Sequence, residues 1–338
     1  SSSTLSVSST MTNSISYLKA SNTGEDDRFG NVLDLSSDGN TLAVGAPQED
    51  SSLTDVNSTA TDTTINDSGA VYVFTKSNNV WQQEAYIKAS NTGAGDNFGS
   101  SISLSGDGKT LVVGAKYEDN NIDDKSNSGA VYVFTKDGTG WSEQDYLKSN
   151  YIDVNDYFGG AGGLDVSDDG SIIAIGAIGE DSAQVGTSNA INNGLKQADG
   201  AGAAYIFTYN GSGWIQTAYI KASNSGAGDN FGTLSLSGNG STLVVGAPGE
   251  DGTASNAGAV YVFGYNGTNW LQEDYLQASN AEADDEFGGD ESLVISQDGL
   301  TIAMCAPGED SNALGLRDVN TEGADNSSQS SSAVYVFR

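Results

Sequence analysis

Acidic side chains recur at two fixed positions along this sequence. The first lies one or two residues before a Phe-Gly pair and holds Asp27, Asp96, Asp156, Asp229 and Glu286. The second is a Glu-Asp pair three residues after an alanine, with the members Glu49, Asp50, Glu118, Asp119, Glu180, Asp181, Glu250, Asp251, Glu309 and Asp310. Carboxylate oxygens, combined with backbone carbonyls, are ligands that Ca²⁺ takes in proteins. These two positions therefore predict calcium binding.

A second interpretation of the same residues stays open. Acidic runs are usually solvated, and a Glu-Asp pair can simply cap a turn. A third acidic position is too sparse for calcium, because it offers at most one or two carboxylates per turn; its residues are Asp38, Asp107, Asp168, Asp169 and Asp298. We expect plain hairpin turns there.

Catalysis has little support in the residue types. The chain contains no histidine, which excludes Ser-His-Asp and Cys-His nucleophile pairs and the usual zinc ligands. Paired carboxylates remain, as in glycoside hydrolases. Such an enzyme needs unique residues in unlike environments, whereas these acidic residues recur almost identically along the chain. We therefore predict that the chain is not an enzyme, with a glycoside hydrolase as the alternative.

The elements that position these carboxylates form a five-fold internal repeat. Its units begin near Phe29, Phe98, Phe158, Phe231 and Phe287. Spacing within a unit is strict, except for the segment after each Glu-Asp pair, which ranges widely in length. Repeats of this period are supersecondary units that bury their apolar faces against neighbours, and insertions in them usually map to loops on one face.

The pattern of each unit predicts four short strands. In the second unit, Ser101 to Ser105 alternates apolar and polar residues, and Thr110 to Ala115 is almost continuously apolar. The β-branched and aromatic run Ala130 to Phe134 follows, and then a strand from about Trp141 to Lys148. Four-stranded antiparallel units around an axis are propeller blades. The fold class is thus predicted to be an all-β, five-bladed β-propeller.

The ends of the sequence predict how the ring closes. The last unit stops after its third strand, at Phe337 and Arg338, whereas Ser14 to Lys19 aligns with a fourth strand that has no blade of its own. We expect residues 10–20 to complete the fifth blade, since closure removes an open sheet edge. Residues 1–338 would then form one domain.

Connections in a blade alternate between the two faces of the disc, so both acidic positions should share one face with the long loops.

Other repeated residues have structural interpretations. We expect the tryptophans to pack between blades, with sugar stacking as the alternative; they are Trp81, Trp141, Trp214 and Trp270. The lysines should form weak surface pairs with the acidic loop that follows them; they are Lys19, Lys88, Lys148 and Lys221.

The net charge of the chain limits which molecules it could bind. The formal net charge of -32 argues against nucleic acid or anionic membrane, because phosphates would be repelled, and favours cations or cationic surfaces. No transmembrane run is present, so no membrane insertion is expected.

Cys305 is the single cysteine and stands where other repeats have glycine. Burial of this thiol is a simpler expectation than reactivity.

The recurrent Phe-Gly, Gly45-Ala46-Pro47 and Gly246-Ala247-Pro248 segments resemble the FG-GAP repeat of integrin α-subunit propellers and many secreted bacterial proteins. The resemblance covers essentially the whole chain. It implies an extracellular or cell-surface adhesion module that binds a protein or glycan ligand, often with calcium; a carbohydrate-binding lectin is the alternative. Integrin propellers have seven blades, so their ligand sites do not transfer.

Overall fold

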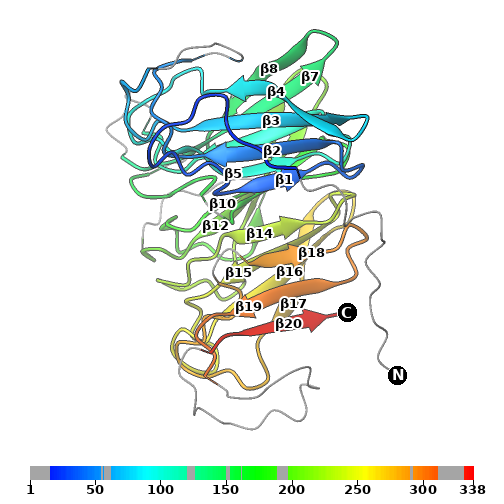
Figure 1. Cartoon of the computed structure of the whole chain (residues 1–338). Coiled ribbons are helices and arrows are strands. Elements are labelled where there is room, and N and C mark those ends of the chain that lie inside the picture. The colour runs from blue at the N-terminus through cyan, green and yellow to red at the C-terminus, as the bar shows by residue number, and fades with distance from the viewer. Residues whose placement is uncertain are drawn as a thin grey trace.

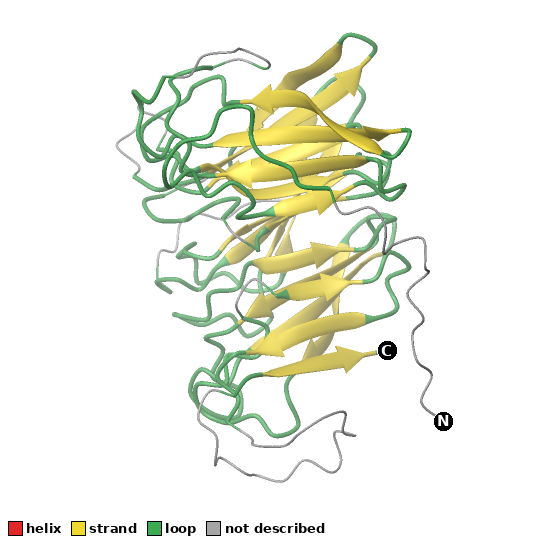
Figure 2. Cartoon of the chain, in the orientation of Figure 1, coloured by secondary structure: helices red, strands yellow, loops and turns green. Residues whose placement is uncertain are grey.

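The computed structural model describes residues 16–54, 56, 62–119, 126–149, 153–160, 162–188, 197–289, 292–310 and 331–338. Among these residues the only regular secondary structure is β-strand, and no helix is present. The strands form separate antiparallel sheets, one for each Phe-Gly unit (Figures 1 and 2). The predicted all-β, five-bladed propeller is confirmed.

The blades follow one another in chain order. The first contains β1 (Leu33–Leu35), β2 (Thr41–Ala46), β3 (Ala70–Ser77) and β4 (Val80–Ile87); the second contains β5 (Phe98–Leu104), β6 (Thr110–Ala115), β7 (Ala130–Asp137) and β8 (Gly140–Leu147). The third contains β9 (Leu164–Val166), β10 (Ile172–Ala177), β12 (Ala203–Tyr209) and β13 (Trp214–Ile220), with β11 (Thr187–Ser188) added beside β13. The fourth contains β14 (Thr233–Leu236), β15 (Thr242–Ala247), β16 (Ala259–Tyr265) and β17 (Trp270–Leu276), and the fifth β18 (Leu293–Ile295), β19 (Ile302–Ala306) and β20 (Ala333–Phe337).

Neighbouring blades pack face to face through alternating side chains. Val71 and Val73 leave one face of β3 and pack in the same buried cluster as Phe98, Ile102 and Leu104 of the second blade. Because successive side chains of a strand point to opposite faces, Tyr72 between the two valines packs on the other face of the sheet, against Phe29 and Tyr86. This two-sided burial explains why the second and third strands of each unit are almost continuously apolar.

Each Phe-Gly phenylalanine holds an aromatic stack. The ring centroid of Phe98 lies 5.2 Å from that of Tyr132 and 6.0 Å from that of Phe134, both in edge-to-face geometry. Tyr132 in turn contacts Tyr146 of β8 at 5.1 Å. Edge-to-face pairs are a preferred aromatic arrangement. The stack therefore ties the entrance of a blade to its third and fourth strands.

The turns between the first two strands of each blade meet at one end of the ring. Ser37 N donates to Gly106 O at 3.0 Å, and Gly238 N donates to Gln297 O at 3.1 Å. Gln297 Nε2 also donates to Ser37 Oγ at 3.1 Å, which joins the fifth blade to the first. Asp168 completes the set through its N donating to Gly238 O at 2.8 Å. Hydrogen bonds at this end thus join the first blade to the second, the third to the fourth, the fourth to the fifth and the fifth to the first.

The fifth sheet has three strands in the part of the chain that the structure describes, in the order β18, β19, β20. Of the segment predicted to complete it, residues 10–15 lie outside the described residues, and residues 16–20 form no strand. Completion of the fifth blade by residues 10–20 therefore stays a prediction.

Close approach of successive blades depends on one glycine in each of the first four blades. A Cβ on this glycine would lie directly against the carbonyl oxygen of the next blade's Phe-Gly turn; the pairs are Gly45 with Gly99, Gly114 with Gly159, Gly176 with Gly232, and Gly246 with Gly288. The glycine thus sets the distance between neighbouring blades.

We expect Gly114→Ala to lower the free energy of unfolding by about 1–3 kcal/mol, because the added methyl group must displace the next blade's backbone. Gly138→Ala is the matched control, since its Cβ would meet nothing within 4 Å, and it should change stability by less than about 0.5 kcal/mol. Urea denaturation of both variants measures the difference. Equal effects of the two substitutions would contradict this role of Gly114.

Candidate functional site

The two predicted acidic positions lie together at one end of the sheets. Backbone hydrogen bonds join the loop that enters a blade to the connection between its second and third strands: Gln48 N donates to Asp27 O at 3.4 Å, and Tyr117 N donates to Asp96 O at 3.3 Å. Figure 2 shows the longer loops gathered at this end, opposite the short hairpin turns. The predicted shared face is therefore present, and we call it the loop face.

The glutamate of each Glu-Asp pair is a buried structural centre. Glu49 Oε2 accepts a hydrogen bond from Lys88 Nζ at 2.7 Å, and Glu49 Oε1 accepts from Tyr86 OH at 2.9 Å and Asn22 Nδ2 at 2.6 Å. Both Lys88 and Glu49 are buried. Lys88 Nζ also donates to Ser68 Oγ at 2.8 Å. One carboxylate thus links the entering loop, the fourth strand and the second connection.

The same arrangement returns in the other blades. Glu118 accepts from Lys148 Nζ at 2.5 Å, Tyr146 OH at 2.9 Å and Asn91 Nδ2 at 2.9 Å. In the other blades Glu180 accepts from Lys221, Glu250 accepts from Asn224, Tyr275 and Gln277, and Glu309 accepts from Asn280. The expectation of weak surface pairs with the following loop was wrong for Lys88, Lys148 and Lys221, because each pairs with the earlier glutamate of its own blade.

Burial governs the charges at this centre. Desolvation lowers the pKa of Lys88 and of Lys221, and the adjacent glutamate carboxylate opposes that shift in each case. Desolvation, with the nearby Glu49 charge, raises the pKa of Tyr86 above its usual value. The tyrosine hydroxyl therefore stays protonated and donates to the carboxylate.

The aspartate two residues before each Phe-Gly pair closes its own loop. Its carboxylate accepts a hydrogen bond from the backbone N–H three residues earlier: Asp27 from Gly24, Asp96 from Gly93, Asp156 from Asp153, Asp229 from Gly226 and Asp285 from Glu282, at 2.5–2.8 Å. Desolvation raises the pKa of Asp96 and of Asp229 to about 6, with Glu118 and Glu250 adding like-charge repulsion. These carboxylates stabilise the loop but are costly to ionise.

In the last unit, Glu286 is not the equivalent of the aspartate that lies two residues before each Phe-Gly pair. Its side chain is exposed and its backbone has a φ of 55°. Asp285, one residue earlier, is buried and carries the equivalent hydrogen bond to Glu282 N at 2.8 Å. Counting back two residues from Phe287, as in the other four units, would have found it.

The aspartate that follows each buried glutamate caps the next loop. Asp50 Oδ1 accepts from Asp67 N at 2.8 Å, Asp181 Oδ1 from Gly200 N at 2.9 Å, and Asp251 Oδ1 from Asn256 N at 2.9 Å. Asp119 and Asp310 occupy the same position and are half-buried. The capping interpretation thus accounts for these three hydrogen bonds.

Within the described ranges no group of three or more His, Cys, Asp or Glu side chains is arranged to hold a metal ion. Most of the predicted carboxylates already accept hydrogen bonds from the protein. Calcium binding at the fifteen named residues stays a prediction from the sequence.

The tryptophans lie in the packing between blades. Trp141, Trp214 and Trp270 are buried in three different inter-blade clusters, whereas Trp81 is half-buried against a cluster made of the first blade and its entering loop. Their rings are therefore not free to stack on a sugar.

Tyr117 and Tyr157 are half-buried aromatic residues of the loop-face segments, with ring centroids 6.0 Å apart.

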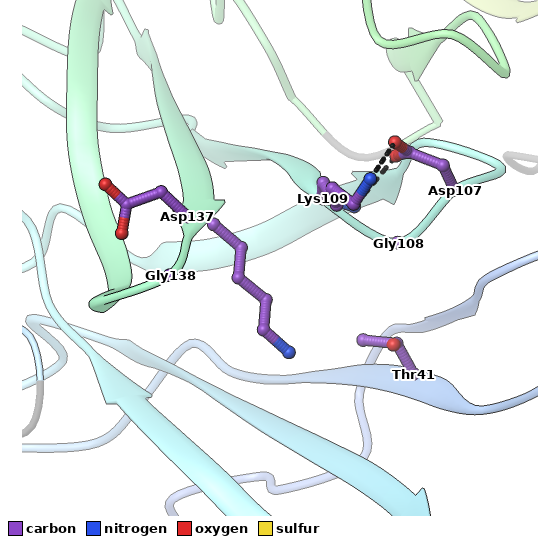
Figure 3. A pocket seen from close by; sticks show the side chains of 7 residues that line it. Thr41, Asp107, Gly108, Lys109, Asp137 and Gly138 are labelled. Atoms are coloured by element: carbon purple, nitrogen blue, oxygen red, sulfur yellow. Dashed lines mark hydrogen bonds and ion pairs between the residues drawn. The ribbon is translucent and has the colours of Figure 1, made fainter.

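A shallow hollow lies away from the loop face, between turns of the first two blades. Figure 3 shows its lining residues, among them Thr41, Asp107, Lys109 and Asp137. Lys109 Nζ lies 3.4 Å from Asp107 Oδ2, and both side chains are exposed. The hollow includes none of the predicted site residues.

The FG-GAP repeat model matches residues 81–134 and 214–263. This confirms the repeat recognised in the sequence. A search of curated proteins finds no match. The described residues include no helix long and apolar enough to cross a membrane.

Solved structures similar to this chain include a candidate 6-phosphogluconolactonase of Bacteroides uniformis, at 14% identity and a TM-score of 0.47, covering 83% of this chain and 65% of that one. The periplasmic gluconolactonase of Pseudomonas aeruginosa is 15% identical with a TM-score of 0.46, covering 80% of this chain and 63% of that one. Kuenenia stuttgartiensis hydrazine synthase is 13% identical with a TM-score of 0.46, and the match covers 80% of this chain and 67% of that one. This chain thus spans about two thirds of their lengths.

These neighbours correct the prediction that the chain is not an enzyme. Two of them are named as lactonases, so the exclusion of catalysis does not stand. The fold hosts both enzymes and binding modules. At this identity and TM-score no activity carries over to this chain.

We expect Lys88→Met to lower the free energy of unfolding by about 3–5 kcal/mol, because it leaves the buried Glu49 charge unpaired. Lys88→Gln should cost less, since Gln277 donates to Glu250 at 3.2 Å in the fourth blade. Lys109→Met removes an exposed pair and should cost at most about 1 kcal/mol. Urea denaturation tests the order, and similar values for both methionine variants would refute it.

We expect Asp96→Asn to flatten the pH dependence of stability between about pH 4 and 6. The native pKa of about 6 lies above the ordinary value of 3.8. The native state therefore binds this proton more tightly, and the stabilising contribution present below about pH 4 is lost as the pH rises through 6. Urea denaturation at a series of pH values measures the slope. An unchanged slope in the asparagine variant would contradict the assignment.

Proposed function

We propose that this chain, which is an FG-GAP-repeat β-propeller, is an extracellular or cell-surface binding module whose ligand is held by the loop face. The observation that carries the proposal is the contrast between a repeated framework and variable loops. The buried glutamate centres recur from blade to blade, whereas the connections after them differ in length and sequence. Binding residues are disproportionately found on loops that a rigid scaffold positions.

The charge of the loop face favours a cationic ligand. Glu25, Asp26, Asp251, Asp284 and Glu286 are exposed on loops at this end. The formal net charge of -32 adds a long-range attraction for basic surfaces. We therefore propose a protein ligand with a basic patch, as expected of an adhesion module. Calcium support of the loops is part of the proposal and rests on the acidic residues alone.

A glycan ligand is the second candidate. The four repeated tryptophans are engaged in packing, so they do not favour it. The observation that does is the half-buried pair of Tyr117 and Tyr157 on the loop face. Aromatic rings with one polar end are common at interfaces where one side is wet.

Charge reversal tests the loop face. We expect Glu25→Lys with Glu286→Lys to reduce binding to immobilised basic matrix proteins at least tenfold, mainly through slower association. Glu273→Lys with Asp274→Lys is the matched control, since these exposed residues lie on β17 and give the same change in charge. Surface plasmon resonance in calcium and in EDTA measures both variants.

Equal losses in the two charge-reversal variants would show only a net-charge effect and would contradict the proposed site. Binding to a glycan array that Tyr117→Ala abolishes, without binding to any matrix protein, would favour the glycan ligand instead. Identical binding in calcium and EDTA would remove calcium from the proposal.

A further inference from the structure

The buried glutamate of the first blade holds an amine and an amide at the two oxygens of one carboxylate. Glu49 Oε2 accepts a hydrogen bond from Lys88 Nζ at 2.7 Å, and Glu49 Oε1 accepts one from Asn22 Nδ2 at 2.6 Å. The lysine follows β4 directly, whereas the asparagine belongs to the entering loop. Two groups that can react with each other thus meet at one carboxylate from segments far apart in the chain.

The second blade has the same set and adds a donor to the amide carbonyl. Lys148 Nζ lies 2.5 Å from Glu118 Oε2, and Asn91 Nδ2 donates to Glu118 Oε1 at 2.9 Å. Tyr132 OH donates to Asn91 Oδ1 at 2.5 Å. Desolvation raises the pKa of Tyr132 above its usual value, so this hydroxyl stays protonated. Negative charge that develops on the amide oxygen therefore has a hydrogen-bond donor already in place.

These groups are the parts needed for an amide exchange. An unprotonated lysine amine is a nucleophile, and burial lowers the pKa of Lys88. A carboxylate within hydrogen-bond distance of both nitrogens can take a proton from the amine and pass one to the leaving nitrogen. Because Lys88 and Glu49 are buried, bulk water is kept away from the reacting groups. Groups held together in this way react as if at very high concentration.

We propose that the lysine and the asparagine of the first two blades join in intramolecular isopeptide bonds, Lys88 to Asn22 and Lys148 to Asn91. Lysine Nζ gives one proton to the glutamate and attacks Cγ of the asparagine. The Nζ–Cγ bond forms and the Cγ–Nδ2 bond breaks, while the glutamate passes a second amine proton to Nδ2, which leaves as ammonia. The products are a neutral secondary amide, a protonated glutamate and ammonia, so atoms and charge balance without an oxidant or a cofactor.

The product suits a buried site better than the ion pair does. Bond formation removes the charge of the lysine and leaves the glutamate protonated, and buried charges are costly even when paired. The new amide also ties the entering loop to the end of the fourth strand, which restricts the unfolded chain between them. This role is independent of the ligand proposed for the loop face.

Two other blades each lack one member of the set. In the fourth blade, Glu250 accepts from Asn224 Nδ2 at 2.7 Å, and Tyr261 OH donates to Asn224 Oδ1 at 2.8 Å. Gln277 stands in place of the lysine there. The third blade has the lysine, but a tyrosine lies seven residues before Phe158, where the other four units have asparagine. Neither blade is therefore expected to form the bond.

Intact mass spectrometry of the denatured full chain tests the bonds. Each bond releases one ammonia, so the two bonds should make the chain about 34 Da lighter than its sequence mass. Lys148→Gln introduces the residue type that the fourth blade uses, and it should reduce the deficit to about 17 Da. In a tryptic digest, tandem mass spectrometry should find the peptides of Lys88 and Asn22 joined, since trypsin does not cleave after an acylated lysine.

The converse test adds the missing lysine to the fourth blade. Because Asn224, Glu250 and Tyr261 are already in place, Gln277→Lys should create a third bond and increase the deficit by about 17 Da. The matched control is Gln277→Lys with Asn224→Ala, which has the amine without the amide and should show no further loss.

Three results would overturn the proposal. A folded chain with its full sequence mass would leave the two centres as ion pairs. A deficit that is unchanged in Lys148→Gln would place the loss of ammonia elsewhere, such as a succinimide at Asn210 and Gly211. A Gln277→Lys variant that melts as the parent does and forms no third bond would refute the assigned set of reacting groups.

Discussion

A buried carboxylate at the loop end of each blade is the interaction on which the rest of the structure depends. Glu49, with Lys88, Tyr86 and Asn22 around it, joins the entering loop, the fourth strand and the second connection of the blade. A buried charge is tolerated only when paired and hydrogen-bonded. The loops above therefore start from fixed points, and they can differ between blades without disturbing the sheets.

The second constraint is the short distance between blades. Glycines such as Gly114 let one blade's sheet contact the next blade's turn, and side chains such as Asp34 and Asp165 accept backbone N–H groups across the inner strands. At the interface of the fifth and first blades, Cys305 stands in place of this glycine and Val294 in place of the accepting side chain. A ring made of near-identical units thus has one distinct seam, and the chain's own sequence marks it at Val294 and Cys305.

Corrections to the sequence-based interpretation share a physical cause. Lysines were expected on the surface because charged residues usually are, yet Lys88 and Lys221 are buried by the convergence of loops from three segments. Glu286 was chosen by proximity to Phe287, whereas the loop hydrogen bond selects Asp285. The exclusion of an enzyme relied on repetition of residue types, which says nothing about whether one blade's loops build a unique site.

Strand order, blade number and the shared acidic face followed from the sequence alone, because the period of the Phe-Gly units and the alternation within Ala130 to Phe134 report local geometry and two-sided burial. Spacing could not reveal which acids are buried, since Glu118 and Asp119 are adjacent, yet Glu118 is buried and Asp119 is half-buried. Only the tertiary structure decided that Glu118 pairs with Lys148, that Asp96 resists ionisation, and that the seam walls at Leu33 and Val334 are exposed. Partners and desolvation depend on segments distant in the chain, and no local pattern encodes them.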